Sequence, residues 1–132
     1  MKTLKITLPA ASPTLNVLLR SHYYKKRKEL EKWGWLIRKA TDQQRNHVPK
    51  PIVKCTIHVE RYSTGNGVDW DGFYGGLKPI LDCLVVPTAK NPNGLGFILD
   101  DNPKVLLALT GKQSKCKKGD EKTVVYIREV DE

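Results

Sequence analysis

The strictest constraint on the fold is the alternation of apolar and polar residues from Val53 to Glu60. The apolar residues of this segment are Val53, Cys55, Ile57 and Val59. The polar residues are Lys54, Thr56, His58 and Glu60. Side chains alternate between the two faces of a strand, so the pattern predicts a strand with one buried face. We therefore expect a sheet with helices packed against its apolar face, and a surface position for His58.

Three further segments have strand character. Leu4–Leu8 alternates in the same way and ends at Pro9. A third strand is predicted at about Lys104–Leu109, and the run T-V-V-Y-I-R-E-V predicts a fourth at Thr123–Val130. We expect the last two strands to form a hairpin across a basic loop at Gln113–Asp120.

Two helices are predicted between these strands. The first, Tyr23–Arg45, has apolar residues at helical spacing, namely Leu30, Trp33, Ile37 and Ala40. The second, about Gly72–Val86, contains Pro79, so we expect this helix to bend or to begin irregularly. The segment P-A-A-S-P-T-L-N (residues 9–16) is predicted to be an extended loop, and Pro87–Gly96 a long turn-rich one.

The predicted order of elements is β-α-β-α-β-β within a single domain, residues 1–132. It indicates an α/β (α+β) fold in which two helices cover a four-stranded mixed sheet. A length of 132 residues, with 39% hydrophobic and 28% charged residues, is typical of one soluble domain. Without a long apolar run or a signal-peptide pattern, we expect no membrane partner and a cytoplasmic location. We also expect no small-molecule cofactor. Three widely spaced cysteines favour reduced thiols over disulfides or a zinc site: Cys55, Cys83 and Cys116.

The charge of the chain indicates an anionic partner. Lys and Arg total 23 against 14 Asp and Glu, a net charge of +9, and such an excess is common in proteins that bind a phosphate backbone. One cluster lies at the start of the first predicted helix, where the helix dipole disfavours cations. An anionic ligand would explain this cluster, although a solvated helix face is the simpler alternative. The first cluster is Lys25, Lys26, Arg27 and Lys28, and a second is Lys112, Lys115, Lys117 and Lys118.

Acidic residues are concentrated in one part of this basic chain. Asp69, Asp71 and Asp82 lie within a short segment, and Asp100 and Asp101 follow before the next strand. In an extended segment the spacing of Asp69 and Asp71 places both carboxylates on one side, where their repulsion favours a shared cation. Mg²⁺ prefers such oxygen ligands, needs only a few of them, and supports phosphodiester hydrolysis.

Lys78 is the basic residue best placed to stabilise charge that develops at a phosphate, because the second predicted helix carries it close to the acids. Each of these residues also has a simpler interpretation. Asp71 could cap the second helix, and Asp82 could pair with Lys78 one turn away. Asp100 and Asp101 could be ordinary turn residues.

Taken in order, these segments resemble the RusA family of Holliday junction resolvases. The resemblance rests on D-W-D-G-F-Y-G-G-L-K-P-I-L-D-C-L (residues 69–84) and I-L-D-D-N-P-K-V (98–105). It also rests on the opening I-T-L-P-A-A-S-P-T-L-N-V-L-L-R-S-H (6–22), so it is scattered over most of the chain. The chain differs from the family pattern in having Gly72 in place of Asn and in placing Lys78 further from Asp71.

The resemblance implies an endodeoxyribonuclease that resolves four-way DNA junctions by paired symmetric nicks, in recombination and repair. It implies that the metal-binding catalytic acids are Asp69, Asp71 and Asp101 and that Lys78 is the essential basic residue. Asp82 and Asp100 become supporting or alternative ligands of Mg²⁺, for which Mn²⁺ can substitute. The resemblance further implies a homodimer from bacteria or prophages, with junction-facing residues Asn16, Arg20 and His22.

Two other functions stay open at the level of sequence. A non-catalytic nucleic-acid-binding accessory protein would account for the charge, but it has no use for five clustered Asp residues. A nuclease for other branched DNA, such as flaps or replication forks, would use the same chemistry on a different substrate. Cleavage that depends on Mg²⁺ would distinguish a junction nuclease from the accessory protein. Competition among branched, single-stranded and linear duplex DNA would distinguish it from a nuclease for other branched DNA.

Overall fold

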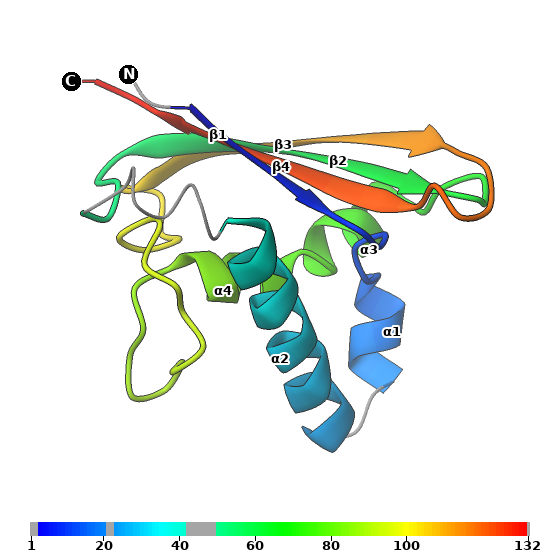
Figure 1. Cartoon of the computed structure of the whole chain (residues 1–132), viewed down its shortest axis with the longest axis horizontal. Helices are drawn as coiled ribbons and strands as arrows, with labels where there is room; N and C mark the ends of the chain where they lie inside the picture. Colours follow the sequence, from blue (N-terminus) through cyan, green and yellow to red (C-terminus); the bar gives the residue numbers. More distant parts are fainter. Residues whose placement is uncertain (1–2, 21–22, 42–49, 132) are drawn as a thin grey trace.

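The computed structural model describes residues 3–20, 23–41 and 50–131 of the chain. These residues form a four-stranded sheet with helices packed against one of its faces (Figure 1). The strands are β1 (Thr3–Leu8), β2 (Cys55–Ser63), β3 (Leu106–Lys115) and β4 (Lys122–Glu129). The helices are α1 (Leu15–Arg20), α2 (Tyr23–Ala40), α3 (Trp70–Gly75) and α4 (Lys78–Leu84). The predicted fold class and the four-stranded mixed sheet are confirmed.

The strands lie in the order β1-β4-β2-β3, with β4 antiparallel to both of its neighbours and β3 parallel to β2. The predicted hairpin between the last two strands is therefore wrong, because β2 lies between them. The sequences explain this order. β4 contains the apolar run T-V-V-Y-I and is mostly buried, whereas β3 contains G-K-Q-S-K and suits an exposed edge. β3 also begins and ends later than predicted, since it starts at Leu106 and residues 110–115 continue the strand into the predicted basic loop.

Parallel pairing of β2 and β3 determines where the acidic segment lies. Parallel strands cannot be joined by a tight turn, so the chain needs a long crossover between them. Here α3, α4 and the segment from 85 to 105 form that crossover beneath the sheet (Figure 1). All five of the clustered Asp residues belong to this connection or to its boundaries with the strands.

The segment around Asn16 is a short helix, α1, and not the predicted extended loop. The Thr14 hydroxyl accepts a hydrogen bond from the backbone N–H of Val17 (3.4 Å), which satisfies a donor of the first turn. Leu15 also lies against Gly75 of α3. This contact comes from a distant part of the chain, so local sequence patterns could not indicate it.

The second predicted helix is divided into α3 and α4 at Gly76 and Leu77. Gly76 is the C-cap of α3, and its N–H donates to the Gly72 carbonyl (3.1 Å). Pro79 lies in the first turn of α4, where a missing backbone N–H leaves no hydrogen bond unmade. The irregularity expected from Pro79 is thus a restart of the helix.

The core lies between the sheet and the helices. As predicted, α2 buries Trp33 and Ile37, with Leu30 and Ala40 partly buried beside them. The Trp33 ring N–H donates to Glu29 (2.9 Å), so this large ring leaves no polar atom unsatisfied. The predicted end of this helix, residues 42–45, lies outside the described residues.

Val53 does not belong to the buried face as predicted, since its side chain is 62% exposed. β2 begins only at Cys55, and the preceding Ile52 forms a parallel bridge with Ile98. Ile52 is thereby buried in place of Val53. Within the described ranges, no helix is long and apolar enough to cross a membrane.

Candidate metal and nucleic-acid site

The long loop after α4 folds back against the end of that helix. The Leu84 carbonyl accepts hydrogen bonds from the N–H groups of Phe97 (2.9 Å) and Ile98 (3.0 Å). The Asn91 side chain donates to the Asp82 carbonyl (2.7 Å). These bonds occupy carbonyls at the C-terminal end of α4, which would otherwise lack partners. The loop therefore returns the chain to α4 just before it reaches Asp100.

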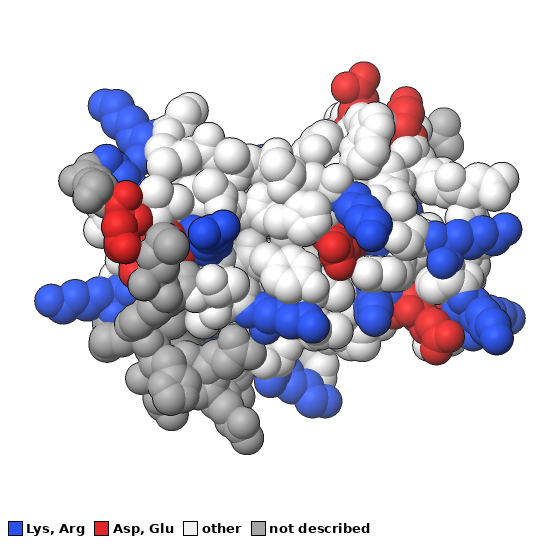
Figure 2. Space-filling view, turned by 90° about the horizontal axis from the view of Figure 1, so that it is seen from above, with Lys and Arg blue, Asp and Glu red and all other residues white. Residues whose placement is uncertain are grey.

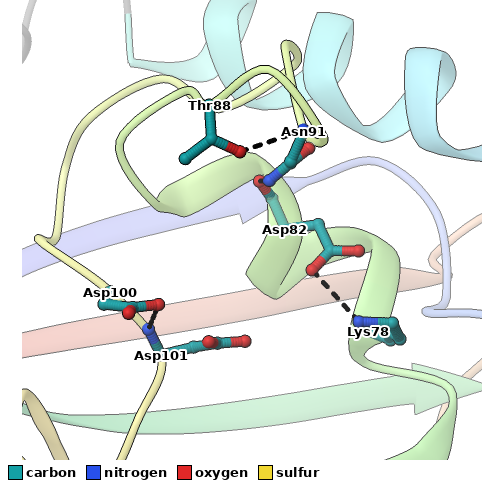
Figure 3. A network of polar contacts seen from close by, with 6 residues as sticks. All are labelled: Lys78, Asp82, Thr88, Asn91, Asp100 and Asp101. Carbon is teal, nitrogen blue, oxygen red and sulfur yellow. Dashed lines mark hydrogen bonds and ion pairs between the residues drawn. The ribbon is translucent and has the colours of Figure 1, made fainter.

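Two acidic positions and one lysine converge as a result. Lys78 Nζ lies 3.4 Å from Asp82 Oδ1, one helical turn along α4. The Asp101 side chain extends toward this pair from the loop before β3 (Figure 3). Partial burial of its carboxyl raises the pKa of Asp101, and the neighbouring Asp100 and Asp82 carboxylates raise it further. A cation placed among these carboxylates would relieve their repulsion.

Asp100 has a different role from its neighbour. Its carboxylate accepts hydrogen bonds from the Asp101 backbone N–H (2.8 Å) and from the Asn102 side chain (2.9 Å). The Asp101 N–H bond is the main reason that the pKa of Asp100 is lowered. Asn102 in turn accepts from the N–H of Lys104 (2.9 Å). Asp100 thus shapes the turn that leads into β3, as its simpler interpretation held, and that turn carries Asp101.

The first acidic pair lies at the start of α3. Asp69, and not Asp71, is the N-cap: its Oδ1 accepts from the Gly72 N–H (3.0 Å). Asp71 is exposed in the first turn of the helix. Trp70 stands between them, 51% exposed, with its ring 5.5 Å from that of Phe73. Of the residues that the structure describes, no three His, Cys, Asp or Glu side chains form a group that could hold a metal ion.

Sequence reasoning named these acids but missed the residues that position them. Thr88, Asn91 and Asn102 hold the loop and the turn in place through side-chain hydrogen bonds. The sequence could have indicated these three residues, because Asn and Thr side chains in turn-rich segments commonly form hydrogen bonds with nearby backbone groups.

The described carboxylates that best fit a divalent cation are Asp82 and Asp101. Mg²⁺ is often bound through one or two carboxylates, with water and substrate phosphates completing its shell. A pair of carboxylates beside a lysine therefore fits Mg²⁺ or Mn²⁺ held jointly with a phosphate. The arrangement does not require a third protein carboxylate at the same point.

The predicted DNA-contacting residues lie on separate elements. Asn16 is exposed on α1, and Lys112 and Lys115 are exposed on β3. The cluster Lys25–Lys28 is exposed along the start of α2, where Arg27 pairs with Glu31 (3.5 Å). His22 and the side chain of Arg20 lie outside the described residues.

No protein-family model matches the chain, and a search of curated proteins finds no match. The function is therefore inferred from the residues and from their geometry.

Proposed function

We propose that this protein is a metal-dependent endodeoxyribonuclease that cuts branched DNA, with four-way junctions as its substrate. The observation that carries the proposal is the convergence of Asp101, from the loop before β3, with Asp82 and Lys78 of α4. A carboxyl group whose pKa is raised by burial and by the neighbouring acids, close to a lysine, favours a site for a divalent cation and a phosphate. The net charge of +9 favours a polyanionic substrate.

In this proposal Asp101 and Asp82 hold Mg²⁺ or Mn²⁺, and Asp100 keeps the turn beneath Asp101 in shape. The metal, when bound, polarises the phosphoryl oxygen and lowers the pKa of the attacking water. Lys78 is 74% exposed, so it can leave Asp82 and approach a phosphate oxygen on which negative charge develops.

Asp69 and Asp71 remain in the proposed catalytic set. The end of α3 is joined to the start of α4 through only Gly76 and Leu77, so both helices belong to one short stretch of the crossover. Asp71 is exposed there, and the Asp69 carboxylate is held in place by its capping bond. The resemblance to the RusA family supports this set. It also supports a cytoplasmic homodimer in which each copy cuts one strand.

The test is a cleavage assay on a labelled mobile four-way junction with Mg²⁺, with Mn²⁺ and with EDTA. Linear duplex, flap and single-stranded DNA serve as competitors. We expect paired symmetric nicks in the junction that need a divalent metal. Tight binding without any cut would favour a non-catalytic accessory protein, and preferred cleavage of flaps or forks would make the protein a nuclease of another substrate class.

The proposed assembly is measured separately. Sedimentation equilibrium of the free protein should give the mass of two chains. A dimer places two such sites on one junction at once, so a strict monomer that nicks both strands symmetrically would contradict the homodimer.

A further inference from the structure

One face of the sheet has none of the described helices against it, and we call it the open face (Figure 1). Its residues alternate with the buried ones along each strand, and they are mainly cationic, hydroxyl-bearing or aromatic. From β1 and β4 they are Thr3, Lys5, Thr7, Lys122, Tyr126 and Arg128, together with Val124, which is itself buried. From β2 and β3 they are Thr56, His58, Glu60, Tyr62, Ala108, Thr110, Lys112 and Ser114.

Positive charge dominates the open face. Figure 2 looks onto it and shows Lys and Arg side chains spread across the surface, with Asp and Glu mainly toward its margins. The exposed cations at open-face positions of the strands are Lys5, Lys112, Lys122 and Arg128. Among the strand residues of this face Glu60 is the single acid.

Glu60 is engaged within the face itself. Its side chain is only 18% exposed and accepts a hydrogen bond from the Tyr62 hydroxyl (3.0 Å). The same carboxylate lies 3.4 Å from His58 Nε2, and His58 Nδ1 lies 2.7 Å from the Thr110 hydroxyl. The Glu60 bond is also the main reason that the pKa of Tyr62 is raised. This acid therefore orders its neighbours, and the four cations of the face still outnumber it.

The cations are distributed over the whole face. Lys5 lies on the outer strand β1, and Lys112 lies on the opposite outer strand β3. Lys122 and Arg128 lie near opposite ends of β4. At about 3.3 Å per residue along a strand, these two positions are about 20 Å apart. That length matches about six base pairs of duplex at about 3.4 Å per phosphate.

Aromatic and hydroxyl side chains complete the surface. Lys5 Nζ lies 5.8 Å from the centre of the Tyr126 ring, and Lys122 Nζ lies 4.8 Å from that of Tyr62. Such contacts hold lysines over the sheet while their charges stay accessible. Arg, Lys, Ser, Thr and Tyr side chains are the common donors to DNA phosphates.

We infer that the open face binds the phosphate backbone of a duplex DNA arm. The inference extends the proposed function, on which its biological meaning rests, by assigning the surface that grips DNA away from the acidic site. A second copy of this chain is a poorer partner for the face, because a face-to-face dimer would bring like charges together.

The test compares two triple variants that each lower the net charge from +9 to +6. One removes charge from the open face: Lys112→Gln, Lys122→Gln and Arg128→Gln. Its matched control removes three cations from α2 that lie outside every proposed site: Lys32→Gln, Arg38→Gln and Lys39→Gln. Binding to a labelled linear duplex is measured by fluorescence anisotropy in EDTA at several salt concentrations, so that no cleavage is needed.

We expect the open-face variant to lose about tenfold or more in affinity at 0.1 M salt, and the slope of log K against log salt to fall by about 2.7. The control should lose less than about threefold, and both melting temperatures should stay close to wild type. Equal losses in the two variants, or none in either, would overturn the inference. So would a change of oligomeric state confined to the open-face variant. Binding that depends on the open face in a protein that never cuts DNA would preserve the inference and refute the proposed function.

Discussion

Gly76 and Pro13 meet backbone to backbone at the corner between α3 and α4. A Cβ atom on Gly76 would overlap the Pro13 carbonyl oxygen, and one on Gly75 would crowd the Leu15 side chain. The two glycines therefore let the start of α1 pack against the corner that separates Asp71 from Lys78. The wider spacing of these two residues, relative to the RusA pattern, has a packing role in this fold.

Replacing Gly76 should destabilise the protein. We expect Gly76→Ala to lower the free energy of unfolding by about 1–3 kcal/mol, because the new methyl group can fit only if the backbone moves. Gly65 is the matched control, since nothing lies within 4 Å of a Cβ built there. Gly65→Ala should be neutral or stabilising by up to about 1 kcal/mol. Urea denaturation measures both, and equal stability of the two variants would show that the corner relaxes freely.

Asp69 combines a helix cap with a proposed metal-binding carboxylate, and two substitutions separate these roles. Asp69→Ala should cost about 0.5–2 kcal/mol of stability, whereas Asp69→Asn keeps a capping oxygen and should cost much less. Junction cleavage should be lost in both variants, because both lack the carboxylate. Wild-type cleavage by Asp69→Asn would show that Asp69 only caps α3 and does not bind the metal.

Replacing Asp100 and Asp101 by Asn should change the stability of the protein in opposite directions. The raised pKa of Asp101 means that the folded state binds the proton more tightly than the unfolded chain, so stability falls as pH rises from about 4 through that pKa. Asp101→Asn should raise the melting temperature at pH 7, and the gain should fade toward pH 4. The lowered pKa of Asp100 contributes stability above about pH 4 that is lost on acidification, so Asp100→Asn should lower the melting temperature at pH 7.

Thermal melts between pH 3 and pH 8 test this pair. Added Mg²⁺ should raise the melting temperature of the wild type by binding the folded state, and should do so less in Asp101→Asn. An identical response of both proteins to Mg²⁺ would remove Asp101 from the proposed ligands.

Lys78 should matter for cleavage far more than for stability. Its ion pair with Asp82 is mostly exposed, so Lys78→Met should change the free energy of unfolding by about 0.5 kcal/mol or less. We expect cleavage to fall by about a hundredfold or more, because the proposed charge stabilisation at the phosphate is lost. The control is Glu31→Gln, which breaks the similarly spaced Arg27–Glu31 pair on α2 and should leave cleavage unchanged. Equal activity of the two variants would contradict the role of Lys78.

The cysteines should differ in their reaction with a thiol reagent. Burial raises the pKa of Cys55 to about 11 and that of Cys83 to about 12, so neither forms the reactive thiolate at neutral pH. Cys116 is partly exposed, and its pKa is raised as well, so it should react first and faster at pH 9 than at pH 7. Mass spectrometry after labelling of the folded protein should locate one modified site, and early labelling of Cys83 would show that the core opens.

Much of the secondary structure followed from the sequence because its signals are local. The alternation in β1 and β2 and the apolar stripe of α2 reflect the 2.0 and 3.6 residue periods of strand and helix. The acids and Lys78 could likewise be chosen from the sequence, since clustered carboxylates on a basic chain are unusual. Pro79 correctly indicated an irregular second helix, because its geometry acts within one turn.

Tertiary structure alone decided the order of the strands and the grouping of the acids. β2 lies between β4 and β3 and pairs with β3 in parallel. No local sequence pattern specifies which strands become neighbours. The convergence of Asp101 with Asp82 depends on hydrogen bonds from the returning loop to Leu84, which join residues distant in the chain. Likewise, the positive charge of the open face arises from four strands aligned in register. The sequence by itself determined which residues could do chemistry, and long-range pairing determined which of them meet.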